Sequence, residues 1–387
     1  IESLNHNMKN KVGVVGGAGH IGLPFSCYIQ NKGIDTLIID TNNDILELIK
    51  NKITPFIEYD LQNQLDHAIN NGLQTTLDLN EIKDCNIVII TLGTSSDKHV
   101  IKKFNQLIDD VISKITEGST IILRSTVTLN TINKIIEDKT FNTKKLHLYY
   151  CPERIAEGKA FLELDKIPQI IGSRDNIESE LVLNFFKELN IKTISVNFEE
   201  AVFIKLFLNT YRYSQFSTIN YFDNIASTNS LDFKKLLGIA SESYPRLENV
   251  PDSGMVGGPC LIKDSHTFID SFDDPRGLIS KYFEINKDFI KNIIIKCESK
   301  FDSKKIVQLG LTFKPESDDL RDSQSIELNK SLIKEGYEVK TYDPFINSEE
   351  ELSKIMEFSN NILISTHHKI FDSYDFTDKK VVIVGDK

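Results

Sequence analysis

The chain has 387 residues, of which 40% are hydrophobic and 26% charged, and its formal net charge is -11. This length favours two or three domains over one, and the acidic balance argues against a nucleic-acid-binding surface. No apolar run approaches the length that spans a bilayer, so we expect no membrane segment.

The five cysteines are scattered along the chain and include no Cys-x-x-Cys pair: Cys27, Cys85, Cys151, Cys260 and Cys297. This pattern fits a reducing compartment better than a disulfide framework or a zinc site. The first residues, rich in Asn and Lys, lack the apolar core of a signal peptide. We therefore expect a cytoplasmic protein without a bound metal.

An apolar run over residues 11–15 leads into a glycine-rich turn, and a helical pattern follows to about residue 32. The turn reads Gly17-Ala18-Gly19-His20-Ile21-Gly22. A second strand, over residues 36–39, ends in Asp40. This order of strand, turn, helix, strand and acid is the dinucleotide-binding fingerprint.

The residue types of this fingerprint suit a pyrophosphate. Gly17 permits the tight turn, Gly19 lets the phosphates approach backbone N–H groups, and Gly22 lets helix and strand pack closely. Asp40 would accept hydrogen bonds from the adenosine ribose and repel a 2′-phosphate, which predicts NAD rather than NADP.

Two further apolar runs, residues 85–90 and 120–123, predict buried parallel strands. Ligands of doubly wound sheets lie at the carboxyl ends of strands. The candidate cofactor contacts there are Thr91, Gly93, Thr94, Ser125 and Thr126. The alternative is that these residues are ordinary caps of the following helices.

A strand over residues 145–150 leads into Cys151-Pro152-Glu153-Arg154, with Glu157 three residues further on, and residues 169–172 form another strand. A carboxylate at a strand end can act as a general base if it is desolvated. Alternatively, Glu153 and Glu157 stand at helical spacing on a solvated face.

Residues 199–226 have the apolar spacing of one long helix without proline or glycine. Lys205 and Asn209 lie one turn apart on one face, where a cation and an amide can stabilise an oxyanion. Alternatively, Lys205 extends along the helix surface, although its apolar neighbours argue for burial. Such an apolar helix also suits a domain joint or a dimer interface.

A second helix, over residues 232–241, precedes the loop Gly257-Gly258-Pro259-Cys260, which is followed by Lys263-Asp264. A thiol after such a turn can be exposed, and a nearby cation favours the nucleophilic thiolate. The alternative is a cysteine packed as a small hydrophobic residue.

The last third predicts a second αβ domain. A helix follows Gly277 to about residue 299, and a long loop over residues 312–323 precedes a helix to about residue 335. Its parallel strands are expected over residues 304–310, 337–342, 361–365 and 380–384.

Taken together, these segments resemble the UDP-glucose/GDP-mannose dehydrogenase family over almost the whole chain. The motifs are the glycine turn, Ser125-Thr126-Val127, Pro152-Glu153 with Glu157-Gly158, Lys205 with Asn209, Gly257-Gly258-Pro259-Cys260 with Lys263-Asp264, and Phe313-Lys314-Pro315 with Asp319-Leu320-Arg321-Asp322-Ser323. The resemblance implies an α/β fold with two Rossmann-like doubly wound domains joined by a central helical region that dimerises. The expected domains are an NAD-binding domain (1–198), a central domain (199–300) and a nucleotide-sugar-binding domain (301–387).

The resemblance also implies roles for individual residues. Cys260 would be the nucleophile, Lys205, Asn209 and Asp264 would surround the reacting carbon, and Glu153 with Thr126 would serve thioester hydrolysis. Glu157 and Arg321 would contact the cofactor, together with His20, Ile21 and the other residues of the turn. The expected substrate contacts are Glu153, Arg154, Lys205, Asn209, Arg246, Gly257, Gly258 and Lys314.

The activity implied is the four-electron oxidation of a nucleotide-sugar C6 alcohol to a carboxylate with NAD, for surface polysaccharide synthesis. The sequence around Glu153 and Cys260 resembles the branch acting on UDP-N-acetylhexosamines, such as UDP-N-acetylmannosamine, more closely than the UDP-glucose branch. UDP-glucose or GDP-mannose oxidation is the alternative within the family. Rivals outside it are a two-electron hydroxyacid dehydrogenase, which needs no cysteine, and a catalytically silent NAD-binding protein.

Overall fold

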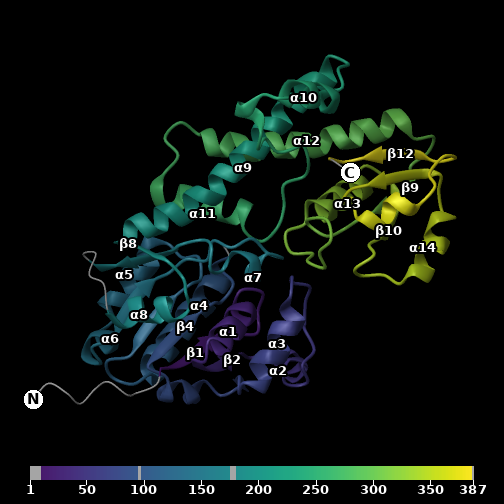
Figure 1. Cartoon of the computed structure of the whole chain (residues 1–387). Coiled ribbons are helices and arrows are strands. Elements are labelled where there is room, and N and C mark those ends of the chain that lie inside the picture. The colour runs from purple at the N-terminus through teal and green to yellow at the C-terminus, as the bar shows by residue number, and fades with distance from the viewer. Residues whose placement is uncertain (1–9, 95–96, 175–179, 386–387) are drawn as a thin grey trace, which may run out of the picture. The chain divides into compact units, whose positions relative to one another are not determined.

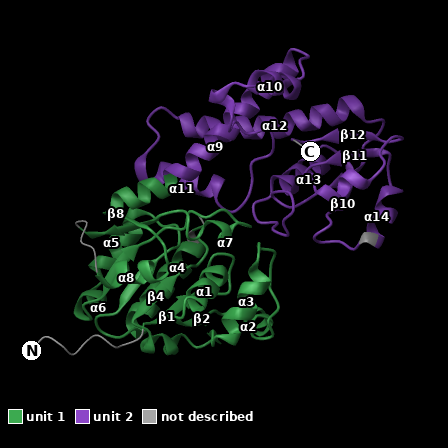
Figure 2. Ribbon diagram, in the orientation of Figure 1, with its two compact units in different colours: residues 1–206 green, residues 207–387 purple. Residues whose placement is uncertain are grey.

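The computed structural model describes residues 10–94, 97–174 and 180–385. The expectation that no signal peptide is present rests on residues 1–9, which lie outside this range. The chain divides into two compact units, residues 1–206 and 207–387 (Figure 2). In the part of the chain described, each unit contains one sheet.

The first unit is built on an eight-stranded sheet of order β3-β2-β1-β4-β5-β6-β7-β8 (Figure 1). The strand order runs outward in both directions from β1, which is the doubly wound topology that the sequence predicts. All neighbouring strands are parallel except β6 and β7. The strands are β1 (Lys11–Val15), β2 (Asp35–Ile39), β3 (Gln74–Thr76), β4 (Ile87–Ile90), β5 (Thr120–Leu123), β6 (His147–Tyr150), β7 (Gln169–Ser173) and β8 (Thr193–Asn197).

Helices connect these strands and cover the sheet with apolar side chains. Val12 and Val14 of β1 pack with Phe25 of α1 and Phe185 of α8 in one buried cluster. Burying each such side chain contributes roughly 1.5–3 kcal/mol, so the alternating residues of β1 anchor the sheet to α1. The helices are α1 (Gly22–Asn31), α2 (Asn43–Lys50), α3 (Leu61–Asn70), α4 (Lys98–Lys114), α5 (Leu129–Glu137), α6 (Lys139–Thr143), α7 (Ala160–Glu163) and α8 (Glu180–Glu188).

The second unit combines long helices with a four-stranded parallel sheet of order β10-β9-β11-β12. Its strands are β9 (Lys305–Leu309), β10 (Glu338–Tyr342), β11 (Asn361–Ile364) and β12 (Lys380–Ile383). Its helices are α9 (Phe198–Thr228), which starts in the first unit, α10 (Phe233–Ser241), α11 (Leu261–Phe272), α12 (Leu278–Lys300), α13 (Gln324–Lys334) and α14 (Glu349–Met356). Among the helices described, none is long and apolar enough to cross a membrane.

The two sheets repeat one local design around their first strands. β1 lies between β2 and β4, and β9 lies between β10 and β11. Each first strand ends in a glycine of positive φ, Gly16 (74°) and Gly310 (80°). A hydroxyl from the neighbouring strand end donates to each glycine carbonyl, Thr91 Oγ1 at 3.0 Å and Ser365 Oγ at 2.5 Å. The second sheet is therefore Rossmann-like at its switch point, and the predicted fold class is confirmed.

Five features of the structure were not predicted from the sequence. The short strand β3 and the half-exposed edge strand β8 lack a buried apolar run, so no hydrophobic pattern in the sequence indicated these strands. Strand β7 pairs antiparallel with β6, and the segment carrying Glu153 and Glu157 is not helical. The expected loop around Cys260 is followed directly by α11.

Candidate active site

In the first unit, the glycine turn between β1 and α1 has room for a ligand on one side and none on the other. A Cβ on Gly17 would lie 2.7 Å from the Val14 carbonyl oxygen, and one on Gly22 would lie 2.6 Å from that of Gly16. A Cβ on Gly19 would meet nothing closer than 3.6 Å. The turn therefore packs tightly against β1 while its Gly19 edge stays open. This is the cradle that a dinucleotide pyrophosphate needs.

Asp40, at the end of β2, is bonded to this turn. Its Oδ2 accepts the Ala18 N–H at 3.1 Å, and its Oδ1 accepts the Asn42 N–H at 3.1 Å. The carboxylate is thus held at the edge of the turn, where a ribose would follow the pyrophosphate. Within the turn, the His20 ring stacks on Phe56 with centroids 4.0 Å apart. Ile21, the next residue, is exposed.

Of the residues that follow β4 and β5, Thr91 supports the glycine turn and Thr94 joins two loops. Thr91 is buried, and its hydroxyl donates to the Gly16 carbonyl, so it supports the glycine turn from below. Thr94 Oγ1 donates to the Thr126 carbonyl at 2.7 Å, which joins the two strand-end loops. Ser125 is buried and its hydroxyl lies 3.4 Å from the Ile90 carbonyl oxygen, whereas Gly93 is exposed.

Glu153, after β6, lies in a tightly bonded environment. Its Oε1 accepts the N–H groups of Arg154 (2.7 Å) and Ile155 (2.8 Å), and its Oε2 pairs with Arg124 at the end of β5. Burial raises the pKa of the Glu153 carboxyl, but the Arg124 charge and these hydrogen bonds outweigh it and hold that pKa below its ordinary value. Glu153 is therefore ionised.

The segment that follows is fixed by Glu58, from the loop before α3. Its carboxylate accepts the N–H groups of Gly158 (2.8 Å) and Ala160 (3.0 Å), which fixes the turn beside Glu157 and the start of α7. Arg154 is partly buried, and its guanidinium donates to the Pro168 carbonyl. Sequence patterns did not reveal Glu58, because its partners lie 100 and 102 residues away.

Lys205 is buried on α9 with 7% of its surface exposed. This burial rules out the alternative of a lysine that extends along a solvated helix surface. Asn209 follows one turn later on the same helix.

In the second unit, Cys260 is exposed and is the cap residue of α11. Backbone N–H groups at a helix N-terminus stabilise a thiolate. One turn further, Asp264 is fully buried, and its Oδ2 accepts the Asn209 amide at 2.6 Å. Lys263 Nζ lies 3.4 Å from its Oδ1. The structure therefore brings Cys260, Asp264 and Asn209 into one cluster.

The two glycines before Cys260 pack against the loop between β9 and α13. A Cβ on Gly257 would lie 2.8 Å from the Asp322 carbonyl oxygen, and one on Gly258 would lie 2.6 Å from the Phe313 ring. Gly258 also has a φ of 91°, and its N–H donates to the Asp322 carbonyl. Only glycine fits both positions, so the two motifs form one packed surface.

The remaining predicted contacts of this unit lie on that loop or near α10. Lys314 Nζ lies 5.3 Å from the centroid of the Phe313 ring. Arg321 forms a fork on Asp319, with Nε 2.9 Å from each carboxylate oxygen. Arg246 is exposed, in a short helical turn, and stacks 5.5 Å from the Tyr244 ring centroid.

A buried pair that the sequence did not indicate supports this loop. His368, fully buried, lies 3.2 Å from Asp343 Oδ2 through Nε2, and its Nδ1 accepts the Glu316 N–H at 3.1 Å. Asp343 also accepts the N–H groups of Leu311 and Thr312. Burial raises the pKa of Asp343, and the hydrogen bonds and His368 more than reverse this.

Family comparisons cover most of the chain. Residues 10–190 match the NAD-binding domain of the UDP-glucose/GDP-mannose dehydrogenase family, residues 199–288 match its central domain, and residues 307–385 match its UDP-binding domain. The three matches follow the chain in the order that the sequence motifs predict.

Individual relatives are similar over nearly their full length. A UDP-N-acetyl-D-mannosamine dehydrogenase of Methanocaldococcus jannaschii is 27% identical, over 96% of this chain and 90% of that protein. A GDP-mannose 6-dehydrogenase of Pseudomonas putida is 25% identical, over 96% and 90%. A solved UDP-D-ManNAc dehydrogenase from Pyrococcus horikoshii has the same fold, with a TM-score of 0.88 at 24% identity, over 97% of this chain and 95% of that one.

Proposed function

The chain belongs to the UDP-glucose/GDP-mannose dehydrogenase family, and from this premise we propose that it oxidises the C6 alcohol of a UDP-sugar to the carboxylate through a covalent intermediate on Cys260. The observation that carries the proposal is the placement of Cys260. It is an exposed thiol at a helix N-terminus, one turn from a buried Asp264 that orients Asn209. A thiol packed as a small hydrophobic residue would be buried.

Two oxidations at one carbon require a means of holding the aldehyde. A first NAD, when bound, would accept one hydride, and a second NAD that replaces the NADH would accept the other. Lys205, buried on α9, stabilises the alkoxide that the C6 hydroxyl becomes as it loses its proton. The Cys260 thiolate adds to the resulting aldehyde carbon and forms a thiohemiacetal, whose oxyanion receives a hydrogen bond from the Asn209 amide. The second oxidation converts the thiohemiacetal to a thioester.

Hydrolysis completes the reaction. A water held by Thr126 attacks the thioester carbonyl and gives its proton to Glu153. The C–S bond then breaks, and the acid and the Cys260 thiolate are released. A serine at this position would leave far less readily than a thiolate, so the residue type suits the last step.

We propose UDP-N-acetylmannosamine, or its glucosamine epimer, as the sugar. The sequence around Glu153 and Cys260 supports this choice, as does the name of the Methanocaldococcus relative. In this proposal residues 1–198 bind NAD, residues 301–387 bind the nucleotide sugar, and residues 199–300 carry the reactive thiol and form a homodimer or larger oligomer. The enzyme would act in the cytoplasm and supply uronic acids for surface polysaccharides.

The test is a panel of UDP- and GDP-sugars with NAD, in which NADH formed is counted per sugar consumed. We expect two NADH per UDP-N-acetylhexosamine, and a Cys260→Ser variant whose turnover to the acid is lower by about three orders of magnitude or more. Cys297→Ser, at a buried cysteine of α12, is the matched control and should keep this stoichiometry.

Other outcomes identify the alternatives. Two NADH from GDP-mannose or UDP-glucose would reassign the substrate within the family. One NADH per sugar, with full turnover in Cys260→Ser, would show a two-electron hydroxyacid-type dehydrogenase. No NADH with any sugar would contradict the proposed activity and favour the silent NAD-binding protein.

A further inference from the structure

Arg124 is a cation buried in the first unit that the catalytic scheme does not use. It stands directly after β5, is 2% exposed, and its guanidinium carbon lies 4.1 Å from the centroid of the Phe25 ring on α1. Its Nη1 donates to Gln169 Oε1 at 2.7 Å, and its Nη2 donates to Glu153. Burying a cation costs several kcal/mol unless it is paired. The fold tolerates Arg124 because it meets the carboxylate of Glu153.

In the hydrogen bonds described above, the Glu153 carboxylate accepts from N–H groups. Arg124 bonds to one carboxylate oxygen, and two backbone N–H groups bond to the other. A protonated carboxyl would lose part of this set, because its O–H would face an N–H. A cavity of about 10 Å³ adjoins Arg124 and Glu153. That is room for about one water molecule. The Arg124 side chain is 1% exposed and that of Glu153 is 12% exposed, so bulk solvent screens the pair only weakly.

We propose that Arg124 is a positioning residue that keeps Glu153 ionised and oriented for hydrolysis of the Cys260 thioester. This inference rests on the proposed function. In the step concerned, the water oxygen bonds to the thioester carbon, its proton passes to Glu153, and the C–S bond breaks with its electrons on sulfur. Nothing is oxidised or reduced, so the step needs no further reactant.

The direction of the pH effect follows from the groups that face Glu153 in the first unit. The cations are Arg124, directly after β5, and Arg154, the residue that follows Glu153. The Cys151 thiol, whose pKa burial raises to about 12, is neutral, and so is Gln169 on β7. Without Arg124, burial would no longer be outweighed to the same extent, and the pKa of Glu153 would rise. Hydrolysis would then fail at a higher pH.

The experiment is a rapid-mixing measurement of NADH formation with excess NAD and UDP-N-acetylmannosamine, across the acidic and neutral range. In the parent enzyme, a burst of two NADH per active site reports formation of the thioester, and the following steady rate reports hydrolysis. In Arg124→Met we expect the burst to remain. We also expect the steady rate to fall at least tenfold and its acid limb to move up by about one pH unit or more.

Two further variants separate positioning from structure. Arg124→Lys keeps the charge but loses the planar fork, so the acid limb should stay near that of the parent while the hydrolysis rate falls. Gln169→Leu removes the other partner of Arg124 and leaves Glu153 paired. It should lower the melting temperature without moving the acid limb.

Each result decides one of the two claims. A parent enzyme with a burst and an Arg124→Met variant whose acid limb is unmoved would overturn the role of Arg124 alone. Loss of burst and hydrolysis together in folded Arg124→Lys would do the same, because it would show a general defect. If the parent forms no NADH with any of the sugars, the proposed function itself fails, and the hydrolytic role of Arg124 fails with it.

Discussion

Asp264 is the buried carboxylate near Cys260. It is fully buried one turn into α11, with the Asn209 amide 2.6 Å from one oxygen and the Lys263 ammonium 3.4 Å from the other. A buried carboxylate accepts hydrogen bonds but donates none, so it fixes the Asn209 side chain with its nitrogen toward Asp264. The second N–H of that amide is then available for the oxyanion that the proposed reaction creates.

Asp264→Asn should therefore lower kcat more than it lowers stability. The new amide can turn its own N–H toward Asn209, which would reverse the orientation of that residue and remove an oxyanion donor. We expect kcat to fall about 100-fold or more, measured by NADH formation, with little change in the melting temperature.

Asp270→Asn is the matched control for this variant. Asp270 lies on the same helix, is exposed, and has no role in the proposed reaction. An Asp264→Asn enzyme with the kcat of Asp270→Asn would contradict the proposed orientation of Asn209.

At the scale of elements, the glycine turn before α1 and the cysteine loop before α11 both depend on glycine for close packing. In each, a glycine is required where a Cβ would strike backbone or an aromatic ring, as at Gly22 and Gly258. The resulting close packing sets where the next helix begins, and that helix start is where the proposed chemistry takes place. Gly19 is different, because the space beside it is open.

This contrast predicts different outcomes for two alanine substitutions in one turn. Gly22→Ala places a methyl group 2.6 Å from backbone atoms, so it should destabilise the protein by about 1–3 kcal/mol. Gly19→Ala should leave the melting temperature unchanged but weaken NAD binding by about tenfold or more, because the methyl group occupies the space of the pyrophosphate. Thermal unfolding and calorimetric titration with NAD measure the two effects, and equal NAD affinity in Gly19→Ala and the parent would place the cofactor elsewhere.

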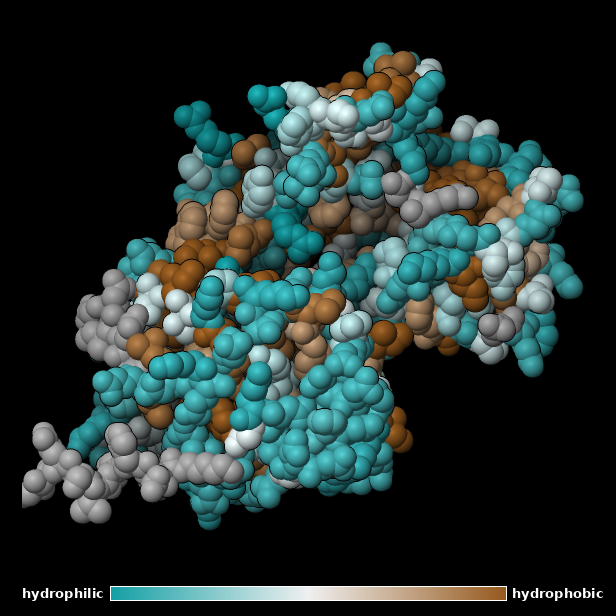
Figure 3. Space-filling view, viewed as in Figure 1, coloured by the Kyte–Doolittle hydropathy of each residue, from teal (hydrophilic) through white to brown (hydrophobic). Residues whose placement is uncertain are grey.

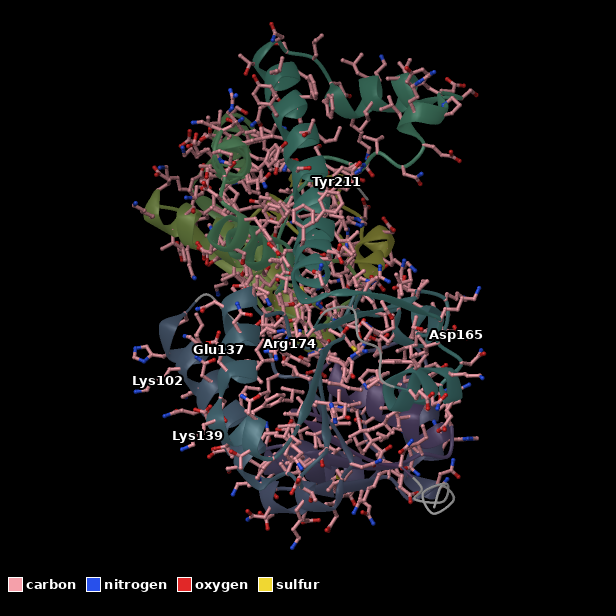
Figure 4. The ribbon with its side chains drawn as sticks, turned by 90° about the vertical axis from the view of Figure 1, so that its left-hand side faces the viewer. Lys102, Glu137, Lys139, Asp165, Arg174 and Tyr211 are labelled. Atoms are coloured by element: carbon pink, nitrogen blue, oxygen red, sulfur yellow. The ribbon has the colours of Figure 1, made fainter. Side chains whose placement is uncertain are left out.

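On the scale of the whole molecule, the second unit has an apolar surface that its own fold leaves uncovered. The exposed residues on α9 are Phe207, Tyr211, Tyr221, Phe222 and Ile225, and those on α10 are Leu236 and Ile239. Figure 4 labels Tyr211 on α9, and Figure 3 shows hydrophobic residues gathered over α10 at the top of the view. Apolar patches of this kind mark interfaces more often than free surface.

We expect this surface to join two copies of the chain. Sedimentation should give about twice the chain mass of 44.1 kDa. The double variant Phe222→Ser with Ile225→Ser should sediment as a monomer. Ile333→Ser removes an equally exposed apolar residue of α13 and should leave the assembly intact. A monomeric parent, or a variant that keeps the parent's mass, would refute this surface as the interface.

The sequence alone determined the parts of this protein that depend on neighbouring residues. Strands β1 and β5 begin and end where their apolar runs do, and the glycine turn was recognised from six consecutive residues. The repeated αβ order also predicted a second αβ domain with a parallel sheet, because short connections between parallel strands leave few topologies. That both sheets are doubly wound was implied by the family resemblance. These features are local, so periodicity and turn chemistry suffice to find them.

Only the tertiary structure decided which polar and charged side chains meet. Arg124 and Glu153 are 29 residues apart, and Asn209 and Asp264 are 55 apart. The first pair meets because β5 and β6 are neighbours in the sheet, and the second joins α9 to α11. No local pattern records such a pairing. An unpaired buried charge is strongly destabilising, so each one needs a partner nearby in space. That partner can lie far away in the sequence, where no local pattern indicates it.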